Sequence, residues 1–316
     1  MKEKIVTIIT LSYNKFDRLY ETIKSVLNQN YSKIQYIIAD DGSKAFPEKD
    51  IIEYIEYNKK NNLVSYIVSH SNINQGTVKN IKRILDEISG KYVMHLSCND
   101  VFYNDDVVSK VVNRFEEKNA EVIVTSRLLY KNNFEPMFYL PHIKERKIIE
   151  GFDTPYKQYK AIVTDQFYDM ASGSAMYFRN TDLFKEIYAD ERFFLWEDGP
   201  FLEKYLWGNK LEFAYDIVSI LYQWGGVSNL SFNSNMHNDL LIFNNEDRIN
   251  HFNELDFFSK RKVKYYIYMY KCKGNFMKII YLLKYPDVFF SNVLYKFKRK
   301  KAKLYDTKFF KNKITM

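Results

Sequence analysis

The chain has 316 residues and a formal net charge of +8, from 47 Lys and Arg against 39 Asp and Glu. Because 46% of its residues are hydrophobic and 17% are aromatic, intrinsic disorder is excluded. The length predicts one large domain, alone or with a smaller appendage. With 10 Gly, 6 Pro and no self-similar period, the sequence does not indicate a repeat protein.

Cysteine content and hydropathy both indicate the cellular compartment. Two cysteines, Cys98 and Cys272, cannot build a disulfide framework, which favours a reducing compartment. The first apolar run, residues 5–11, is too short for a signal peptide or a membrane span, and no cleavage site follows it. No uncharged apolar stretch reaches the roughly 18 residues that a bilayer crossing requires. We therefore expect the protein in the cytosol.

Short apolar runs bounded by polar turns predict five strands. They lie at residues 5–11, 34–39, 63–68, 92–96 and 121–125. A helix-like segment follows each of the first four, as with the apolar spacing of Leu19, Ile23, Val26 and Leu27. Strands that alternate with helices predict an α/β fold with a mostly parallel sheet covered on both faces. After about residue 127 the alternation fades and an aromatic-rich second half begins.

Polar segments follow the first four predicted strands. They are residues 11–14, 40–43, 74–80 and 97–100. Because ligands of such sheets bind at the carboxyl ends of the strands, we expect these segments to form one polar rim.

Acidic residues in three places could carry chemistry. Asp40 and Asp41 could accept hydrogen bonds from a pyrimidine ring or a ribose, or could simply cap an Asp-Gly turn. Asp100 could help bind Mg²⁺ or Mn²⁺ beside diphosphate oxygens and water, or could be an ordinary turn residue. Glu197 and Asp198 follow an apolar run that could desolvate a general base, or could be the acidic first turn of a helix.

Taken together, these segments resemble glycosyltransferase family 2, the nucleotide-diphosphate-sugar enzymes with the GT-A fold. The resemblance covers about residues 4–230. It rests on six segments in a fixed order, namely Ile8 to Asn14, Asp40 to Ser43, Asn74 to Asn80, Ser97 to Asp100, Ser172 to Ser174, and Phe194 to Asp198.

The resemblance implies a donor site in the first half of the chain. Leu11 and Tyr13 match residues that line the nucleotide base, and Asp41 matches the acid that reads the pyrimidine or ribose. Gly76 lies in a segment that contacts the donor. Lys79 falls near a position where many members have arginine, which implies a further donor contact.

The resemblance also implies the catalytic groups. Asn99 and Asp100 lie on the family's Asp-X-Asp segment, with Asp100 at the metal-binding acid. Gly173 lies in the loop that borders the sugar, and Asp198 matches the catalytic base. A distant histidine completes the metal site in some related enzymes, and His237 is the candidate here, with an ordinary surface histidine as the alternative.

Two departures from the family pattern weaken the charge around the donor. Ser97 and Asn99 replace the first acids of the metal motif, which leaves Asp100 nearly alone. Gln223 stands where arginine is frequent in the family, within the segment 222–228.

The charge is concentrated near the carboxyl terminus. Residues 260–316 contain 17 Lys and Arg against 2 Asp and Glu, a local charge of +15, so the other 259 residues carry −7. Apolar residues at helical spacing, such as Val263, Tyr266, Ile279 and Leu283, alternate with these lysines. Basic amphipathic helices suit an anionic lipid surface, but the apolar stripes could instead pack on the body. Nucleic-acid binding is not expected, because the acidic body contains no recognisable binding module.

The sequence thus predicts a GT-A domain at 1–230 followed by a basic helical region at 231–316. The implied activity is inverting transfer of a sugar from a nucleotide-diphosphate sugar, with UDP expected, onto a hydroxyl of a glycan or lipid-linked glycan in bacterial surface-polysaccharide synthesis. The implied cofactor is Mn²⁺ or Mg²⁺, and the implied location is the inner face of the cell membrane. The alternative is a catalytically inactive sugar-nucleotide fold or a basic adaptor protein.

Overall fold

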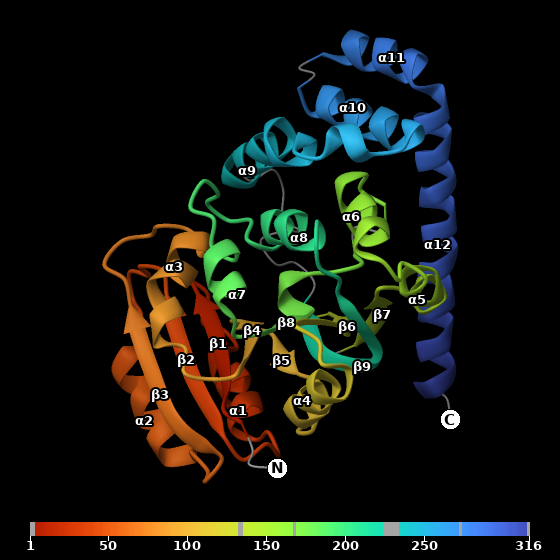
Figure 1. Ribbon diagram of the computed structural model, residues 1–316. Coiled ribbons are helices and arrows are strands. Elements are labelled where there is room, and N and C mark those ends of the chain that lie inside the picture. The colour runs from red at the N-terminus through yellow and green to blue at the C-terminus, as the bar shows by residue number, and fades with distance from the viewer. Residues whose placement is uncertain (1–3, 132–134, 167–168, 224–233, 272–273, 315–316) are drawn as a thin grey trace.

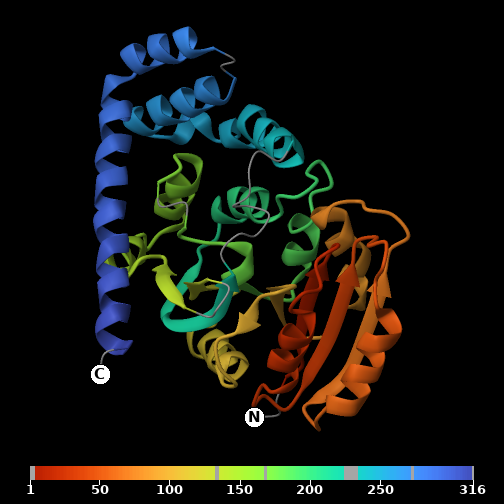
Figure 2. The same cartoon turned by 180° about the vertical axis from the view of Figure 1, so that it is seen from behind.

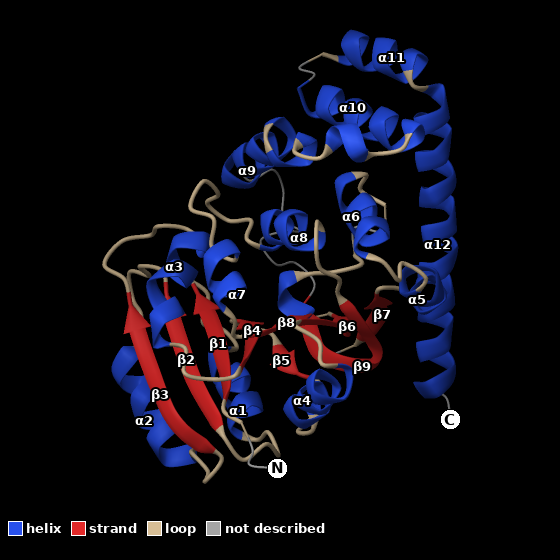
Figure 3. Cartoon of the chain, viewed as in Figure 1, coloured by secondary structure: helices blue, strands red, loops and turns tan. Residues whose placement is uncertain are grey.

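The computed structural model describes residues 4–131, 135–166, 169–223, 234–271 and 274–314. Within these ranges the strands form one nine-stranded sheet in the order β3-β2-β1-β4-β8-β6-β9-β5, with β7 paired to β6 (Figures 1 and 3). The strands are β1 Val6–Ser12, β2 Ile34–Asp40, β3 Leu63–His70, β4 Tyr92–Ser97, β5 Val101–Phe102, β6 Val122–Tyr130, β7 Pro136–Leu140, β8 Met176–Arg179 and β9 Glu212–Gln223.

Helices cover the sheet and extend beyond it. They are α1 Leu19–Leu27, α2 Glu48–Asn58, α3 Thr77–Ile84, α4 Val107–Lys118, α5 Ile143–Glu150, α6 Pro155–Val163, α7 Asp182–Ile187, α8 Asp198–Leu206, α9 Ser234–Asn245, α10 Phe257–Lys271, α11 Asn275–Lys284 and α12 Pro286–Ile314.

The first half of the sheet is parallel because both of its faces are covered. β1 pairs in parallel with β2 and β4, and β2 with β3. Alternate residues of β1 enter opposite cores, since Ile8 packs with Ile23 of α1 and Ile9 packs with Ile81 of α3. This two-sided burial explains why the strands read as continuous apolar runs. All five predicted strands are present, and the α/β prediction is confirmed.

The second half of the sheet is mixed. β8 lies between β4 and β6 and runs antiparallel to both, whereas β9 is parallel to β6. β6 extends to Tyr130, beyond the end of the predicted strand at 125. This extension brings Arg127 to the same edge of the sheet as the carboxyl end of β4.

The C-terminal helices pack on the body of the molecule. Val263 of α10 is fully buried in the core that also contains Ile81. α12 runs along one side of the molecule (Figures 1 and 2), where its buried Asp306 lies 2.9 Å from Nδ1 of His142. Asp306 also accepts a hydrogen bond from the N–H of Ile143 at the start of α5. Packing therefore accounts for the apolar stripe of α10 and for part of α12.

Among the described residues, no helix combines the length and apolar character needed to cross a bilayer. Cys98 is a free thiol whose pKa is raised to about 12, mainly by burial, so it is not a reactive thiolate. Cys272 lies outside the described residues.

Candidate functional site

The carboxyl ends of the parallel strands open onto a cleft of about 1710 Å³. Asp41, Asp100 and Asp198, which are far apart in the sequence, all line it. Leu11, Tyr13, Asn99 and Gly173 line it as well. The structure therefore brings seven of the ten predicted site residues to one place.

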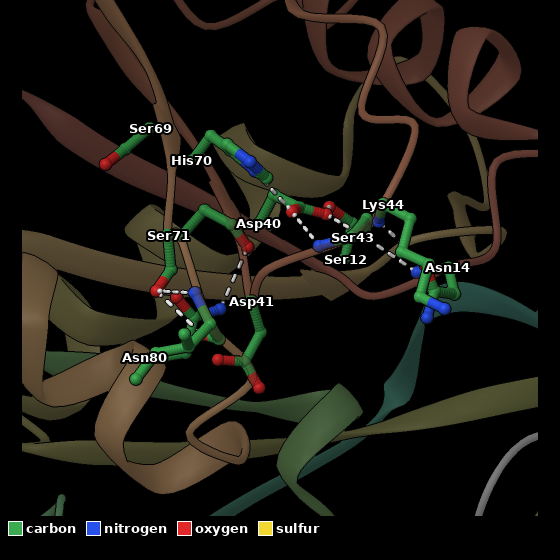
Figure 4. Close-up of polar contacts among 12 residues, drawn as sticks. Ser12, Asn14, Asp40, Asp41, Ser43, Lys44, Ser69, His70, Ser71 and Asn80 are labelled. Atoms are coloured by element: carbon green, nitrogen blue, oxygen red, sulfur yellow. Dashed lines mark hydrogen bonds and ion pairs between the residues drawn. The ribbon is translucent and has the colours of Figure 1, made fainter.

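Asp40 is a structural residue. Its fully buried carboxylate accepts hydrogen bonds from the hydroxyls of Ser12 and Ser43 and from the N–H of Ser43, and it lies 2.8 Å from Nδ1 of His70 (Figure 4). These contacts satisfy the carboxylate within the protein. The carboxylate of Asp41 points away from that of Asp40 in Figure 4.

Asp41 joins its loop to the segment before α3. Its two oxygens accept the backbone N–H groups of Gln75 and Gly76, each at 2.9 Å. Burial raises the pKa of Asp41, and these two hydrogen bonds oppose that shift. Gly76 has φ +89°, and a Cβ there would lie 2.4 Å from the carbonyl oxygen of Phe194. Gly76 thus fixes the approach of two loops, in addition to any contact with a ligand.

Asn99 shapes the turn after β4. It has φ +79°, a conformation that asparagine adopts more readily than most residues. Its side-chain oxygen accepts the N–H of Arg18 at 3.1 Å. Asn99 therefore helps to hold the turn that leads to Asp100.

Asp100 is buried with one unsatisfied oxygen. Its Oδ1 accepts the N–H of Gln223 at 3.2 Å, whereas Oδ2 has no hydrogen-bond partner among the described residues. Burial raises the pKa of Asp100 to about 7, although Arg127 and Arg18 attract its negative charge. A buried carboxylate oxygen without a partner is costly, so Asp100 Oδ2 is open to a hydrogen-bond donor or a cation.

Arg127 of β6 is a site residue that the sequence analysis missed. It donates to the hydroxyls of Ser172 and Ser174 at 2.7 and 3.1 Å, and it lies over the ring of Tyr222. Burial lowers its pKa, and the negative charges of Asp198 and Asp100 raise it. A guanidinium between the two acids places positive charge in the middle of the cleft.

Glu197 and Asp198 occupy the start of α8, as the helix alternative predicted, and they also face the cleft. Asp198 Oδ2 accepts the N–H of Gly173 at 2.8 Å. A Cβ at Gly173 would lie 2.6 Å from Glu197 Oε1, so a larger residue would displace these acids. Burial, and then the charge of Asp198, raise the pKa of Glu197 to about 8. This shift favours the protonated form of Glu197.

Asp239 of α9 holds the segment that leads to these acids. Its buried carboxylate accepts three successive backbone N–H groups, from Phe194 at 2.9 Å, Leu195 at 2.7 Å and Trp196 at 3.0 Å. The Trp196 ring packs on Phe243 of the same helix, with ring centroids 4.9 Å apart. A residue beyond position 230 therefore positions Glu197 and Asp198.

The remaining predicted residues lie apart from this lining. Gly76 is close behind it. Lys79 is exposed on α3, and its contact with the donor stays a prediction. Arg83, one turn further along α3, interacts electrostatically with Asp41 and Asp40. His237 lies on α9, but the described part of the chain contains no group of three or more His, Cys, Asp or Glu suited to a metal ion. Of the segment 222–228, residues 224–228 lie outside the described ranges.

The family model described as "Glycosyl transferase family 2" matches residues 7–183, more than half of the chain. A glycosyltransferase of Rickettsia bellii (strain RML369-C), named as uncharacterized, is 29% identical over 143 residues, which are 45% of this chain and 19% of that protein. TuaG of Bacillus subtilis (strain 168), named as a putative teichuronic acid biosynthesis glycosyltransferase, is 26% identical over 45% of this chain and 54% of its own length. The matches therefore span about a fifth to a half of these relatives.

Solved structures share the fold over a larger part of the chain. S. aureus TarS 1–349 in complex with UDP-GlcNAc has a TM-score of 0.58 at 17% identity, covering 84% of this chain and 71% of that one. Mannosyltransferase PcManGT from Pyrobaculum calidifontis, in complex with GDP-Man and Mn2+, has a TM-score of 0.50 at 12% identity, covering 90% and 75%. At these identities the likeness establishes the GT-A fold.

The Asp239 contacts generate a prediction about local stability. Asp239→Asn removes one accepting oxygen, so at least one buried N–H of residues 194–196 loses its partner at a cost of about 1–3 kcal/mol. We expect faster amide hydrogen exchange in a peptide that contains these residues, measured by mass spectrometry. The control is Asp216→Asn, since the Asp216 side chain is 65% exposed. Unchanged exchange in the Asp239 variant would show that the three contacts do not hold the segment.

Proposed function

The chain belongs to glycosyl transferase family 2, and from that premise we propose that it is an inverting enzyme that transfers a sugar from a UDP-sugar to a hydroxyl of a glycan acceptor. The observation that carries the proposal is the convergence of Asp41, Asp100 and Asp198 on one cleft. The base would then act on the attacking oxygen and the metal on the departing diphosphate, on opposite sides of the anomeric carbon.

Asp198 is the proposed general base. It would accept the proton of the acceptor hydroxyl while that oxygen attacks the anomeric carbon, and the bond to the nucleoside diphosphate would break on the opposite face. The N–H of Gly173 orients the Asp198 carboxylate. The raised pKa of Glu197 would reduce the negative charge beside the base. Arg127 would attract the charge that develops on the leaving diphosphate.

The donor would bind at the end of the cleft formed by Leu11, Tyr13 and Asp41. Tyr13 is 47% exposed there, so its ring is accessible to a nucleobase. UDP is favoured because the TarS structure with a similar fold contains UDP-GlcNAc. The role in bacterial surface-polysaccharide synthesis is proposed from the name of the Bacillus relative.

The residues around Asp100 fit a divalent cation with few protein ligands. The orphaned Asp100 Oδ2 supplies one carboxylate oxygen, and Mg²⁺ or Mn²⁺ commonly takes one or two carboxylates together with substrate phosphates and water. When bound, the cation would neutralise charge on the diphosphate. The PcManGT structure contains Mn2+, which supports this proposal by analogy.

The base assignment predicts different effects on kcat when each of the two neighbouring acids is replaced by its amide. Asp198→Asn removes the proton acceptor, so kcat should fall by about 10²–10⁴ while UDP binding is retained. Glu197→Gln imitates the protonated form and should stay within about tenfold of the native kcat. Release of UDP from a UDP-sugar, measured with a bacterial glycan extract as acceptor, would check both expected values of kcat. Full turnover by the Asp198 variant would remove it as base, and UDP binding without transfer by the native chain would favour the inactive alternative.

The metal assignment predicts a change in cation affinity. Asp100→Asn removes the anionic oxygen, and Mn²⁺ binding to the UDP-saturated protein should weaken at least about tenfold, measured by electron paramagnetic resonance. Asp106→Asn, on the loop before α4, is the control. Native activity that persists in excess chelator would contradict the assignment.

Part of the C-terminal region remains suited to a lipid surface. The apolar stripe of α11 does not pack on the body, since Phe276 is 75% and Leu283 is 77% exposed. Lys278 and Lys284 lie on the same helix, and α12 adds lysines within residues 298–303. Exposed apolar side chains beside lysines suit an anionic membrane. We propose that this surface docks the protein on a membrane that carries a lipid-linked acceptor.

The docking proposal predicts a loss of vesicle binding without loss of fold. Phe276→Gln combined with Leu283→Gln removes two side chains whose full burial is worth about 1.5–3 kcal/mol each, so binding should fall at least about tenfold. Cosedimentation with phosphatidylcholine vesicles, with and without 30% phosphatidylglycerol, measures it. Tyr57→Gln is the control, because Tyr57 is 90% exposed on α2. Equal binding by the double variant and the control would contradict docking through α11.

A further inference from the structure

The cleft is larger than one substrate requires. A site for a single small ligand usually measures about 300–1,000 Å³, whereas this cleft measures about 1710 Å³. The proposed donor residues lie at the carboxyl end of β1 and on the loops after β1, β2 and β4. Much of the rest of the cleft is lined by Arg248 and by residues of α9, α10 and α12, all beyond residue 183, where the match to the family model ends.

This second half of the cleft combines aromatic rings with positive charge. Its aromatic residues are Tyr265, Tyr266, Tyr270, Phe289 and Tyr295. Its basic residues are Arg248, Lys296 and Arg299. Rings with apolar faces and a few polar groups are typical of a saccharide-sized site rather than of an ordinary protein surface.

The charges in this half do not cancel. Asp165 is neutralised by Arg248, whose guanidinium nitrogens lie 2.8 and 3.1 Å from its oxygens. Asp169 lies between two arginines, since it pairs with Arg299 and is 3.7 Å from Arg127. Both guanidiniums have further acids nearby, Asp198 and Asp100 for Arg127 and Glu145 for Arg299. Lys296 lines the cleft and forms no ion pair among the described residues, so its positive charge is left over in this half.

We propose that the part of the cleft walled by α10 and α12 is an acceptor subsite for an anionic saccharide. The tyrosines would contact the sugar rings, and Lys296 with Arg299 would bind a phosphate or carboxylate group of the acceptor. The subsite opens into the same cleft as Asp198, so an acceptor bound there could present a hydroxyl to the base. This inference rests on the proposed function, because it assigns the donor to the other end of the cleft.

Binding of three probes with the same ring tests the subsite. The full chain is first saturated with UDP, so that the donor end is occupied, and is then titrated with glucose, glucose 6-phosphate or glucuronic acid by calorimetry. We expect at least one charged probe to bind about tenfold more tightly than glucose. Which probe gains identifies phosphate or carboxylate as the group that is recognised.

A matched pair of variants on α12 locates the effect. Lys296→Gln should reduce the advantage of the charged probe by about threefold or more, because Lys296 lines the cleft. Lys298→Gln also removes one positive charge, two residues further along the same exposed stretch of α12. It should change the affinity advantage of the charged probe by less than about twofold. Equal affinity for all three probes, or equal loss in both variants, would overturn the subsite. Failure of the native chain to bind UDP would instead overturn the proposed function.

Discussion

The geometry of the site depends on one buried carboxylate. Asp239 accepts three consecutive backbone N–H groups, and the segment that it holds ends in Glu197 and Asp198. On its other side this segment meets α3, where the N–H of Val78 donates to the carbonyl of Phe194. The two acids are therefore placed between the parallel sheet and the C-terminal helices. Backbone amides satisfied by a charge have little freedom, so the carboxylates beyond them are well oriented.

The parallel half of the sheet could be predicted because burial on both faces leaves continuous apolar strands in the sequence. The residues at the strand ends, Asp41 and Asp100, were found by the same reasoning, since topology alone brings them together. Arg127 was missed because the predicted strand ended at 125. The signal was nevertheless present, as a single basic residue within the otherwise uncharged strand Val122–Tyr130. A charge inside such a strand must meet an acid, a hydroxyl or a ligand.

Asp239 could not be predicted from sequence, because nothing in α9 indicates which distant amides its carboxylate would bind. The tail illustrates a related limit. Apolar spacing predicted the helices α10 and α11 equally well, yet Val263 is buried in the main core and Phe276 is exposed. Periodicity identifies an apolar face but not the surface that covers it. Tertiary contacts decided between packing and exposure, and they decided differently for the two helices.

The ion pair between Asp169 and Arg299 bears on how this protein could be re-engineered. It joins a loop before β8 to a helix more than a hundred residues later, and its Arg299 lines the same cleft as Arg127. A chimaera that exchanged only the terminal helices for those of a homologue would lose this ion pair and one side of the cleft. If the proposed acceptor subsite sets specificity, it is therefore not carried by the terminal helices alone. Grafting would have to transplant Asp169, Arg299 and their neighbours as one unit.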